Sequence, residues 1–259
     1  MIVSLLVAIL LLPAANTPLA DAAMQGDLSQ VRLLLAGKAD VNLAQGDGST
    51  ALHWAAYQGD SEMARVLLEA GANVGATTRI GDFSPLLMAA TNGSAAIIEL
   101  LLNGGSDVNT LNAAGTSPLM LAAAAGKPDA VKLLLERGAK VEIRDTINGQ
   151  TALMFAAATN SEEAIKLLAE HGADINTTSK VLQPRNQGEN LDFTDTDRRR
   201  NRGPWLGGLT PLHFAAREGQ MEAVRELVAS GADVNIVSTT DETPSITTAI
   251  INGYFDIGK

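Results

Sequence analysis

The chain has 259 residues, which is enough for one large or two ordinary domains with a sizeable apolar core. Its formal net charge of -10 argues against binding to a nucleic-acid backbone or to an anionic membrane surface. The absence of Cys excludes disulfides and thiolate metal sites, and 46% hydrophobic with only 3% aromatic residues favours short, Ala-rich elements over a large aromatic core.

The N-terminal segment, MIVSLLVAILLLPAA, differs from the rest because residues 2–15 form an apolar run. A helix over this run would reach about 21 Å, which is less than the roughly 30 Å hydrocarbon core of a bilayer. The run and the small residues after it predict a secretory signal peptide over residues 1–16, with cleavage near Ala14 to Asn16. No Lys or Arg precedes the run; the alternatives are an apolar helix packed on the first folded unit and a retained membrane anchor.

The remainder of the chain contains an internal repeat. Each block opens with Thr or Ser and most continue with apolar residues and paired alanines, as in TALHWAAYQG and TPLHFAAREG. The block starts lie 33, 34, 33, 34, 59 and 33 residues apart, at Thr17, Thr50, Ser84, Ser117, Thr151, Thr210 and Thr243. Such regular returns predict a repeat architecture.

Each position of the block has a physical role in a helical pair. The opening Thr or Ser can cap a helix through its hydroxyl, and Pro at the next position suits the first turn. Paired alanines, such as Ala55 and Ala56, let neighbouring helices approach closely. Glycines such as Gly59 end the first helix in the left-handed conformation, and a second helix follows with apolar residues at helical spacing, as at Val131 and Leu134.

These helices are about eight to ten residues long, and isolated helices below about 12 residues are marginal in water. None of them can bury its apolar face alone, so each unit must pack against the next one. The sequence therefore predicts an all-α solenoid of helix-turn-helix units joined by hairpin loops, with about seven repeats over residues 17–259.

The fifth and sixth blocks are 59 residues apart because a polar segment is inserted within residues 179–208. Insertions in repeat arrays map to loops on one face, which is often the binding face. Arg198, Arg199 and Arg200 could meet an acidic partner, and Trp205 could anchor a contact. The alternative is a solvated spacer whose arginines pair with its own carboxylates.

The seventh unit is incomplete, because TPSITTAIINGYFDIGK supplies a first helix and only the opening of a second. A terminal unit needs a polar outer face, whereas Ile246, Ile250 and Ile257 would lack a neighbour. We therefore expect the chain to be a fragment or a truncated gene product, with more repeats or another domain beyond Lys259. On this ground the alternative function is the repeat-bearing N-terminal part of a larger enzyme or receptor, with its active domain beyond residue 259.

The pattern TPLHxAA, followed by Gly and then LLxxGADVN, resembles the ankyrin repeat, and the resemblance covers Thr17 to Lys259. The resemblance implies a non-enzymatic scaffold that binds a protein partner through the concave surface of the array. Outside eukaryotes, similar chains behind a signal peptide are exported, so a bacterial exported ankyrin repeat protein, periplasmic or secreted, is the expectation.

The resemblance assigns structural roles to the histidines. In the family, the His of TPLH bonds the backbone near the turn and fixes the junction between hairpin and helix. His53 and His213 match this position, whereas apolar residues such as Leu87 occupy it in other blocks, which a shared catalytic role could not tolerate. His171 ends a second helix, where a positive charge is favourable.

Enzymatic activity is not expected from these residues. The sequence has no phosphate-binding loop, no dinucleotide glycine fingerprint after a strand, no HExxH motif and no nucleophile elbow. With three His and no Cys, neither a metal site nor a nucleophile-base pair can be assembled convincingly. We therefore predict a monomer with no catalytic residues, cofactor or metal, which binds a protein partner but no nucleic acid and has no stable membrane span.

The resemblance also places the partner-binding surface at the ends of the first helices and at the hairpin tips. Hot spots of interfaces favour Trp, Tyr and Arg, so Tyr57, Arg79 and Arg217 lead among the exposed candidates. The alternative is that all of these are ordinary exposed positions. The predicted partner-binding residues are Tyr57, Gln58, Arg79, Thr91, Asn92, Thr159, Asn160, Arg198, Arg199, Arg200, Trp205, Arg217 and Glu218.

Overall fold

The computed structural model describes residues 17–181, 207–239 and 242–258. The predicted signal peptide over residues 1–16 lies outside the described residues, as does most of the predicted insertion. Four predicted partner-binding residues therefore have no structural description: Arg198, Arg199, Arg200 and Trp205.

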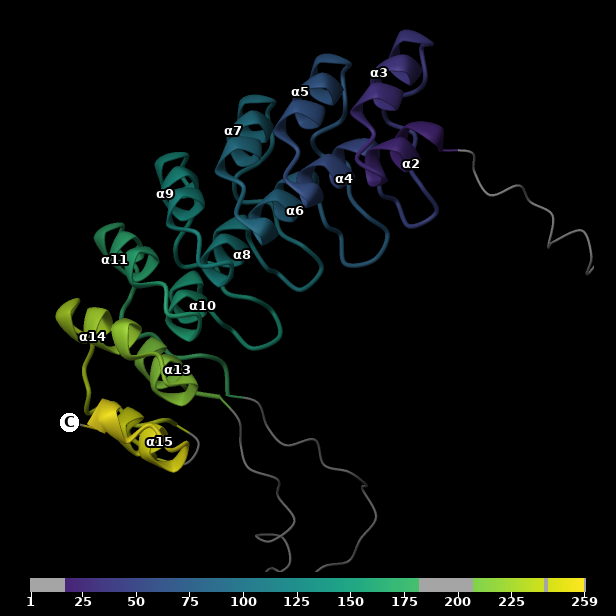
Figure 1. Cartoon of the computed structure of the whole chain (residues 1–259). Coiled ribbons are helices and arrows are strands. Elements are labelled where there is room, and N and C mark those ends of the chain that lie inside the picture. Colours follow the sequence, from purple (N-terminus) through teal and green to yellow (C-terminus); the bar gives the residue numbers. More distant parts are fainter. Residues whose placement is uncertain (1–16, 182–206, 240–241, 259) are drawn as a thin grey trace, which may run out of the picture. The chain divides into compact units, whose positions relative to one another are not determined.

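The described helices come in pairs and divide into two compact units, with the boundary between Asp107 and Val108. The first unit holds the pairs α2 (Pro18–Met24) with α3 (Leu28–Ala36), α4 (Ala51–Gln58) with α5 (Ser61–Glu69), and α6 (Pro85–Asn92) with α7 (Ala95–Asn103). In Figure 1 the first helices of these pairs lie side by side in one layer, and the second helices form a parallel layer. Long hairpin loops connect successive pairs and project from the layer of first helices (Figure 1).

The second unit repeats this arrangement. Its first helices are α8 (Pro118–Ala124), α10 (Ala152–Ala158), α13 (Pro211–Glu218) and α15 (Ser245–Ile251), and its second helices are α9 (Pro128–Glu136), α11 (Glu162–Glu170) and α14 (Met221–Ala229). After α15 the described chain continues only as a short 3₁₀ helix, η2 (Phe255–Gly258). The all-α repeat fold predicted from the periodic blocks is confirmed, with strand pairing in the described residues limited to an isolated bridge between Val237 and Pro244.

The helices begin and end at the residues that the block pattern indicates. Thr50 forms a capping box with His53 at the start of α4, in which each side chain bonds the backbone of the other residue. Pro at the first turn adds a pre-set φ to several helices, including α6 and α13. Gly59 ends α4 at φ 76°, a left-handed conformation that residues other than Gly adopt at a cost.

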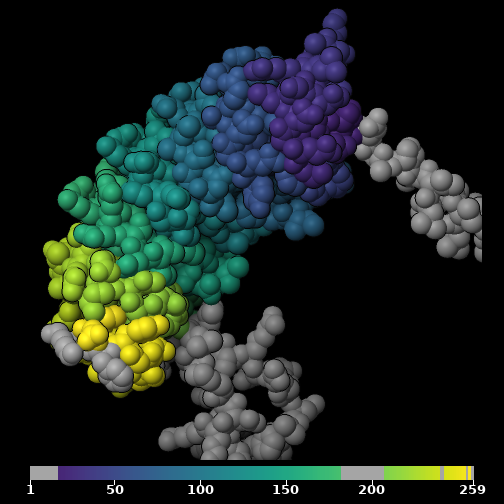
Figure 2. Space-filling view, in the orientation of Figure 1, coloured from purple at the N-terminus to yellow at the C-terminus, as the bar shows by residue number. Residues whose placement is uncertain are grey.

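The core is a series of small interfaces between neighbouring pairs. In α4, Leu52, Ala55 and Ala56 are fully buried, and in α5, Met63 and Leu67 are fully buried. Burying one side chain of Leu or Met size contributes roughly 1.5–3 kcal/mol, so each interface supplies a few kcal/mol and no pair is stable alone. The space-filling view shows successive pairs within each unit in close contact (Figure 2). No helix in the described ranges is both long enough and apolar enough to cross a bilayer.

Candidate functional site

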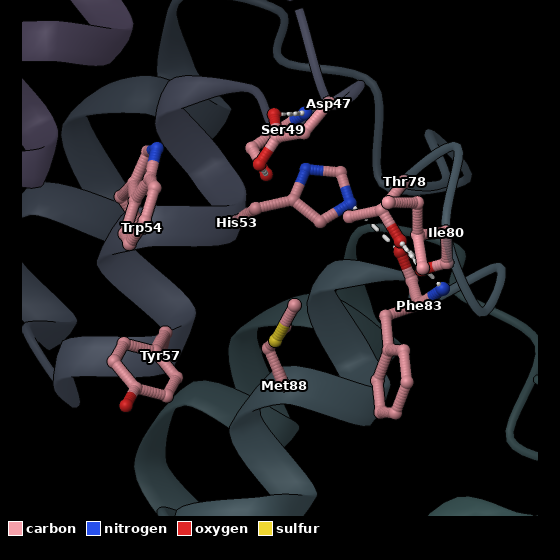
Figure 3. A pocket seen from close by; sticks show the side chains of 9 residues that line it. All are labelled: Asp47, Ser49, His53, Trp54, Tyr57, Thr78, Ile80, Phe83 and Met88. Atoms are coloured by element: carbon pink, nitrogen blue, oxygen red, sulfur yellow. Dashed lines mark hydrogen bonds between the residues drawn. The ribbon is translucent and has the colours of Figure 1, made fainter. Parts of the chain in front are cut away.

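A pocket of about 360 Å³ opens in the first unit, between α4 and the segment that leads into α6. Figure 3 shows Trp54 and Tyr57 on one side of it, Phe83 and Met88 on the other, and polar residues at one end. The lining residues come from two neighbouring pairs and both of their hairpin loops: Asp47, Ser49, His53, Trp54, Tyr57, Thr78, Ile80, Phe83 and Met88.

The walls of the pocket are mostly apolar and aromatic. Trp54 and Tyr57 lie three residues apart on α4, so they share one helix face, and their rings meet edge to face with centroids 6.2 Å apart. Phe83 precedes the N-cap of α6, and Met88 lies within α6. Ile80 is 82% exposed and forms part of the rim. It lies in the hairpin loop between α5 and α6, called the second hairpin loop; the loop between α3 and α4 is the first.

The orientation of Trp54 is set by a hydrogen-bond relay that starts in the preceding pair. Trp54 Nε1 donates to Gln45 Oε1 at 2.8 Å, and Gln45 Nε2 donates to Asp21 Oδ1 of α2 at 2.6 Å. A side chain held in this way loses little conformational entropy when a ligand packs against it. The aromatic wall of the pocket is therefore formed before binding.

His53 lies at the polar end of the pocket and joins its two sides. Its Nδ1 accepts a hydrogen bond from Thr50 N at 3.1 Å, so the proton is assigned to Nε2, which donates to the Phe83 carbonyl at 3.0 Å. Burial lowers the pKa of His53 below its ordinary value and outweighs the opposing effect of the Phe83 hydrogen bond. His53 is thus a neutral framework residue.

The other two histidines also have structural partners. His213 repeats the arrangement in the second unit, where its Nε2 lies 3.0 Å from the Thr243 carbonyl and its Nδ1 accepts from Thr210 N. His171 caps the end of α11, with its Nδ1 2.8 Å from the Leu167 carbonyl. The structural roles predicted for all three histidines are confirmed. Within the described part of the chain, His, Asp and Glu side chains form no group suited to holding a metal ion.

Asp47 and Thr78 complete the polar end. The Asp47 carboxylate accepts hydrogen bonds from Ser49 N at 2.8 Å and Ser49 Oγ at 2.9 Å, and the backbone hydrogen bond is the main reason why the pKa of Asp47 lies below its ordinary value. Thr78 Oγ1 donates to the Ile80 carbonyl and accepts from Phe83 N, which fixes the second hairpin loop. The pocket therefore has a rigid, negatively charged end and an apolar body.

Among the predicted partner-binding residues, Tyr57 lines this pocket, with 56% of its surface exposed. Arg79 lies in the rim loop, where its Nη1 donates to the Gly46 carbonyl of the preceding loop at 2.9 Å. The structure therefore brings two of the leading candidates close to one site.

Other predicted contact residues are engaged in ties between neighbouring helices. Gln58 Nε2 donates to the Met24 carbonyl at 2.7 Å. Asn92 Nδ2 donates to the carbonyls of Ala56 and Tyr57, both at 2.9 Å. These amides satisfy carbonyls at the end of the preceding first helix, which have no partner within that helix.

Side chains at the ends of first helices also bond backbone groups of neighbouring pairs in the second unit. Thr159 Oγ1 lies 3.2 Å from the Ala123 carbonyl of the preceding first helix. Asn160 has a positive φ of 58°, and its side chain accepts a hydrogen bond from Ala223 N and donates to Glu222. Because Ala223 lies beyond the insertion in the sequence, this contact joins the two helical pairs that the insertion separates.

The remaining predicted residues lie apart from the pocket or contact one another. Thr91 Oγ1 donates to the Leu87 carbonyl within α6. Arg217 forms an ion pair with Glu218 at 2.9 Å, and its guanidinium carbon lies 4.9 Å from the centre of the Phe214 ring. Their roles in partner binding stay predictions.

The sequence-based set did not include Trp54, Phe83 and Met88, which supply most of the apolar wall. Trp54 was detectable, because a Trp three residues before an exposed Tyr on one helix marks a shared face. Phe83 and Met88 follow Trp54 by about one repeat, and nothing in their local sequence indicates that they face it.

Comparisons with known proteins agree with this architecture. A family model described as "Ankyrin repeats (3 copies)" matches residues 3–78 and 84–179, and one described as "Ankyrin repeat" matches residues 207–239. The crystal structure of the human ASB11 ankyrin repeat domain is similar, with a TM-score of 0.71 and 27% sequence identity over 90% of this chain and 92% of that chain. No curated protein matches the chain.

Proposed function

The chain belongs to the ankyrin repeat family, whose members are generally non-enzymatic protein-interaction modules, and from this premise we propose that it is a scaffold that docks a protein partner at the pocket of its first unit. The proposal narrows the docking surface to α4, the start of α6 and the two hairpin loops beside them.

The preformed pocket carries this proposal. The chain has two Trp, two Tyr and five Phe, and three of these nine aromatic residues line one pocket. Tyr57 and Ile80 are exposed at its mouth, whereas Trp54 is held by the relay from Asp21. Aromatic anchors in rigid surroundings supply most of the energy of protein interfaces, so this surface is suited to docking.

Affinity capture with the intact chain tests the proposal. We expect proteins captured from an extract of the source organism to be lost with Tyr57→Ala and retained with Ile147→Ala, a matched control at an exposed hairpin tip of the second unit. Both side chains are exposed, so the urea midpoint of Ile147→Ala should equal that of the wild type, and that of Tyr57→Ala should fall only slightly through loss of the edge-to-face contact with Trp54. Capture of no protein, or equal capture by both variants, would refute docking at this pocket.

We also propose export of the chain on the basis of its apolar residues 2–15, which lie outside the described residues. Removal of the predicted signal peptide should give a mature N-terminus near Asn16, which the intact mass of the protein purified from its native host measures. A mass that retains residues 1–16 would contradict cleavage and favour a membrane anchor or an apolar helix packed on the first unit.

The inserted segment is proposed as a second recognition element that includes Arg198, Arg199, Arg200 and Trp205. Deletion of residues 182–206 should then weaken capture of the partner without changing the urea midpoint. Unchanged capture would identify the segment as a spacer.

A further inference from the structure

We infer that the pocket of the first unit receives one bulky apolar side chain from a short, positively charged segment of the partner. The inference rests on the proposed function and adds the chemistry of the segment that is recognised. It follows from the size of the pocket, the charges around it and the rigidity of its lining.

The pocket has room for one large side chain together with the stretch of backbone that carries it. Its volume of about 360 Å³ lies at the lower end of the range of roughly 300–1,000 Å³ for small-ligand sites. Its apolar surface comes from Trp54, Tyr57, Ile80, Phe83 and Met88, so a Leu, Met or Phe side chain would displace water from apolar walls.

The charge distribution of the first unit selects a basic segment. Residues 17–107 contain ten Asp and Glu against four Lys and Arg. Two of the four cations, Arg32 and Arg65, lie on the second helices α3 and α5 and are paired with Glu62 at 2.7 and 2.9 Å. Lys38 lies two residues after the end of α3, so Arg79 is the cation beside the pocket.

Two carboxylates, those of Asp47 and Asp82, lie at the pocket beside Arg79, the one cation that the described residues place there. Asp47 lines the polar end, and Asp82 is exposed next to Phe83 in the second hairpin loop. Arg79 donates one N–H to the Gly46 carbonyl, so its guanidinium is held against the first hairpin loop. A Lys or Arg beside the apolar anchor would meet this excess of negative charge, whereas an acidic segment would be repelled.

The hydrogen bonds that fix the lining residues should make the pocket discriminate strongly between large and small side chains. His53 bonds the Phe83 carbonyl across the pocket, and Gln45 holds the Trp54 indole, so neither wall can easily move aside. A rigid pocket rewards a side chain that fills it and gains little from a small one.

Selection from a randomised peptide library displayed on phage, with the intact chain as bait, tests the inference. We expect the enriched peptides to share one Leu, Met or Phe with Lys or Arg nearby and to lack Asp and Glu. Synthetic versions should bind at least about tenfold more weakly when the anchor is replaced by Ala, and their affinity should fall with added salt. Trp54 fluorescence in a Trp205→Phe background reports binding at the pocket.

Variants of the chain locate the effect. Ile80→Ala should weaken the selected peptides several-fold, whereas Ile147→Ala at the matched hairpin tip of the second unit should not. Asp47→Asn combined with Asp82→Asn should reduce the preference for basic over neutral flanking residues, because Asn keeps the hydrogen-bonding shape without the charge.

The outcomes separate this inference from the proposed function. Enriched peptides that are acidic, that lack an apolar anchor, or that bind Ile80→Ala as well as wild type overturn the inference. No enrichment also overturns it, while Tyr57-dependent capture of a whole protein would leave the proposed function standing. If neither peptide enrichment nor Tyr57-dependent capture of a whole protein is observed, both the inference and the proposed function are overturned.

Discussion

Replacing His53 by Leu should destabilise the first unit in a way that depends on pH. The change keeps a buried side chain of suitable size, because Leu87 occupies the same place in the next pair. It removes the hydrogen bonds of His53 with Thr50 N and the Phe83 carbonyl. Each such bond is worth about 0.5–1.5 kcal/mol, so we expect a loss of about 1–3 kcal/mol in the free energy of unfolding near neutral pH.

The pH dependence follows from the low pKa of His53 in the folded chain. Burial lowers this pKa below the ordinary 6.5, so the unfolded chain takes up a proton first as the pH falls. The contribution of neutral His53 is complete above about pH 6.5 and is lost below it, at up to about 1.4 kcal/mol per pH unit until the folded pKa is reached. His53→Leu has no such titration, so its deficit relative to wild type should shrink in acid.

Urea unfolding followed by Trp54 fluorescence measures this effect next to the substituted residue. Both proteins carry Trp205→Phe, which leaves Trp54 as the only reporter, and the unfolding free energies are compared at about pH 7.5, 6.5 and 5.5. Equal stability near neutral pH, or a constant difference across this range, would refute a buried, neutral His53 that bonds across the pocket.

Three further substitutions test other features of the first unit. Gly48→Ala should cost about 1–3 kcal/mol, because φ is +89° and the new Cβ would lie 2.8 Å from Arg79 N, while Gly46→Ala, which meets nothing within 4 Å, should change the urea midpoint little. Asn92→Ala should lower the free energy of unfolding, measured in urea, by about 1–2 kcal/mol, since it removes two hydrogen bonds to the preceding first helix. An unchanged free energy would contradict a stabilising role of Asn92 and leave partner binding as its role. Glu62→Gln should cost at most about 1 kcal/mol in thermal unfolding at low salt, because its two ion pairs are exposed, and a larger loss would contradict that assignment.

The repeat fold was predictable because its signals are local. A capping residue such as Thr50, a C-terminal Gly59 and the paired alanines between them lie within ten residues, and each acts on its own helix. The framework role of His53 came from the resemblance to the family, which implies a bond to the backbone near the turn. The carbonyl that His53 reaches belongs to Phe83, 30 residues away, and nothing in the sequence identified that partner.

The site was less predictable because it depends on contacts between neighbouring pairs. Asn92 and Gln58 are polar residues at helix ends, which makes them candidates for partner contact, but their amides bond carbonyls more than 30 residues away. Trp54 and Phe83 line opposite sides of one pocket although they are 29 positions apart in the sequence (Figure 3). The position of such a residue in the sequence shows that its side chain points away from its own helix. It does not show which residue of the neighbouring pair the side chain contacts.

The relay from Asp21 through Gln45 to Trp54 ties the pocket to a residue two loops away from its far wall. Two consecutive repeats thus line the cavity, and the repeat before them helps to position its aromatic wall. Duplication or deletion of a repeat among these three would separate the residues of the relay or those that line the cavity. Growth of the array should therefore be tolerated elsewhere, and this trio should be inherited as a block.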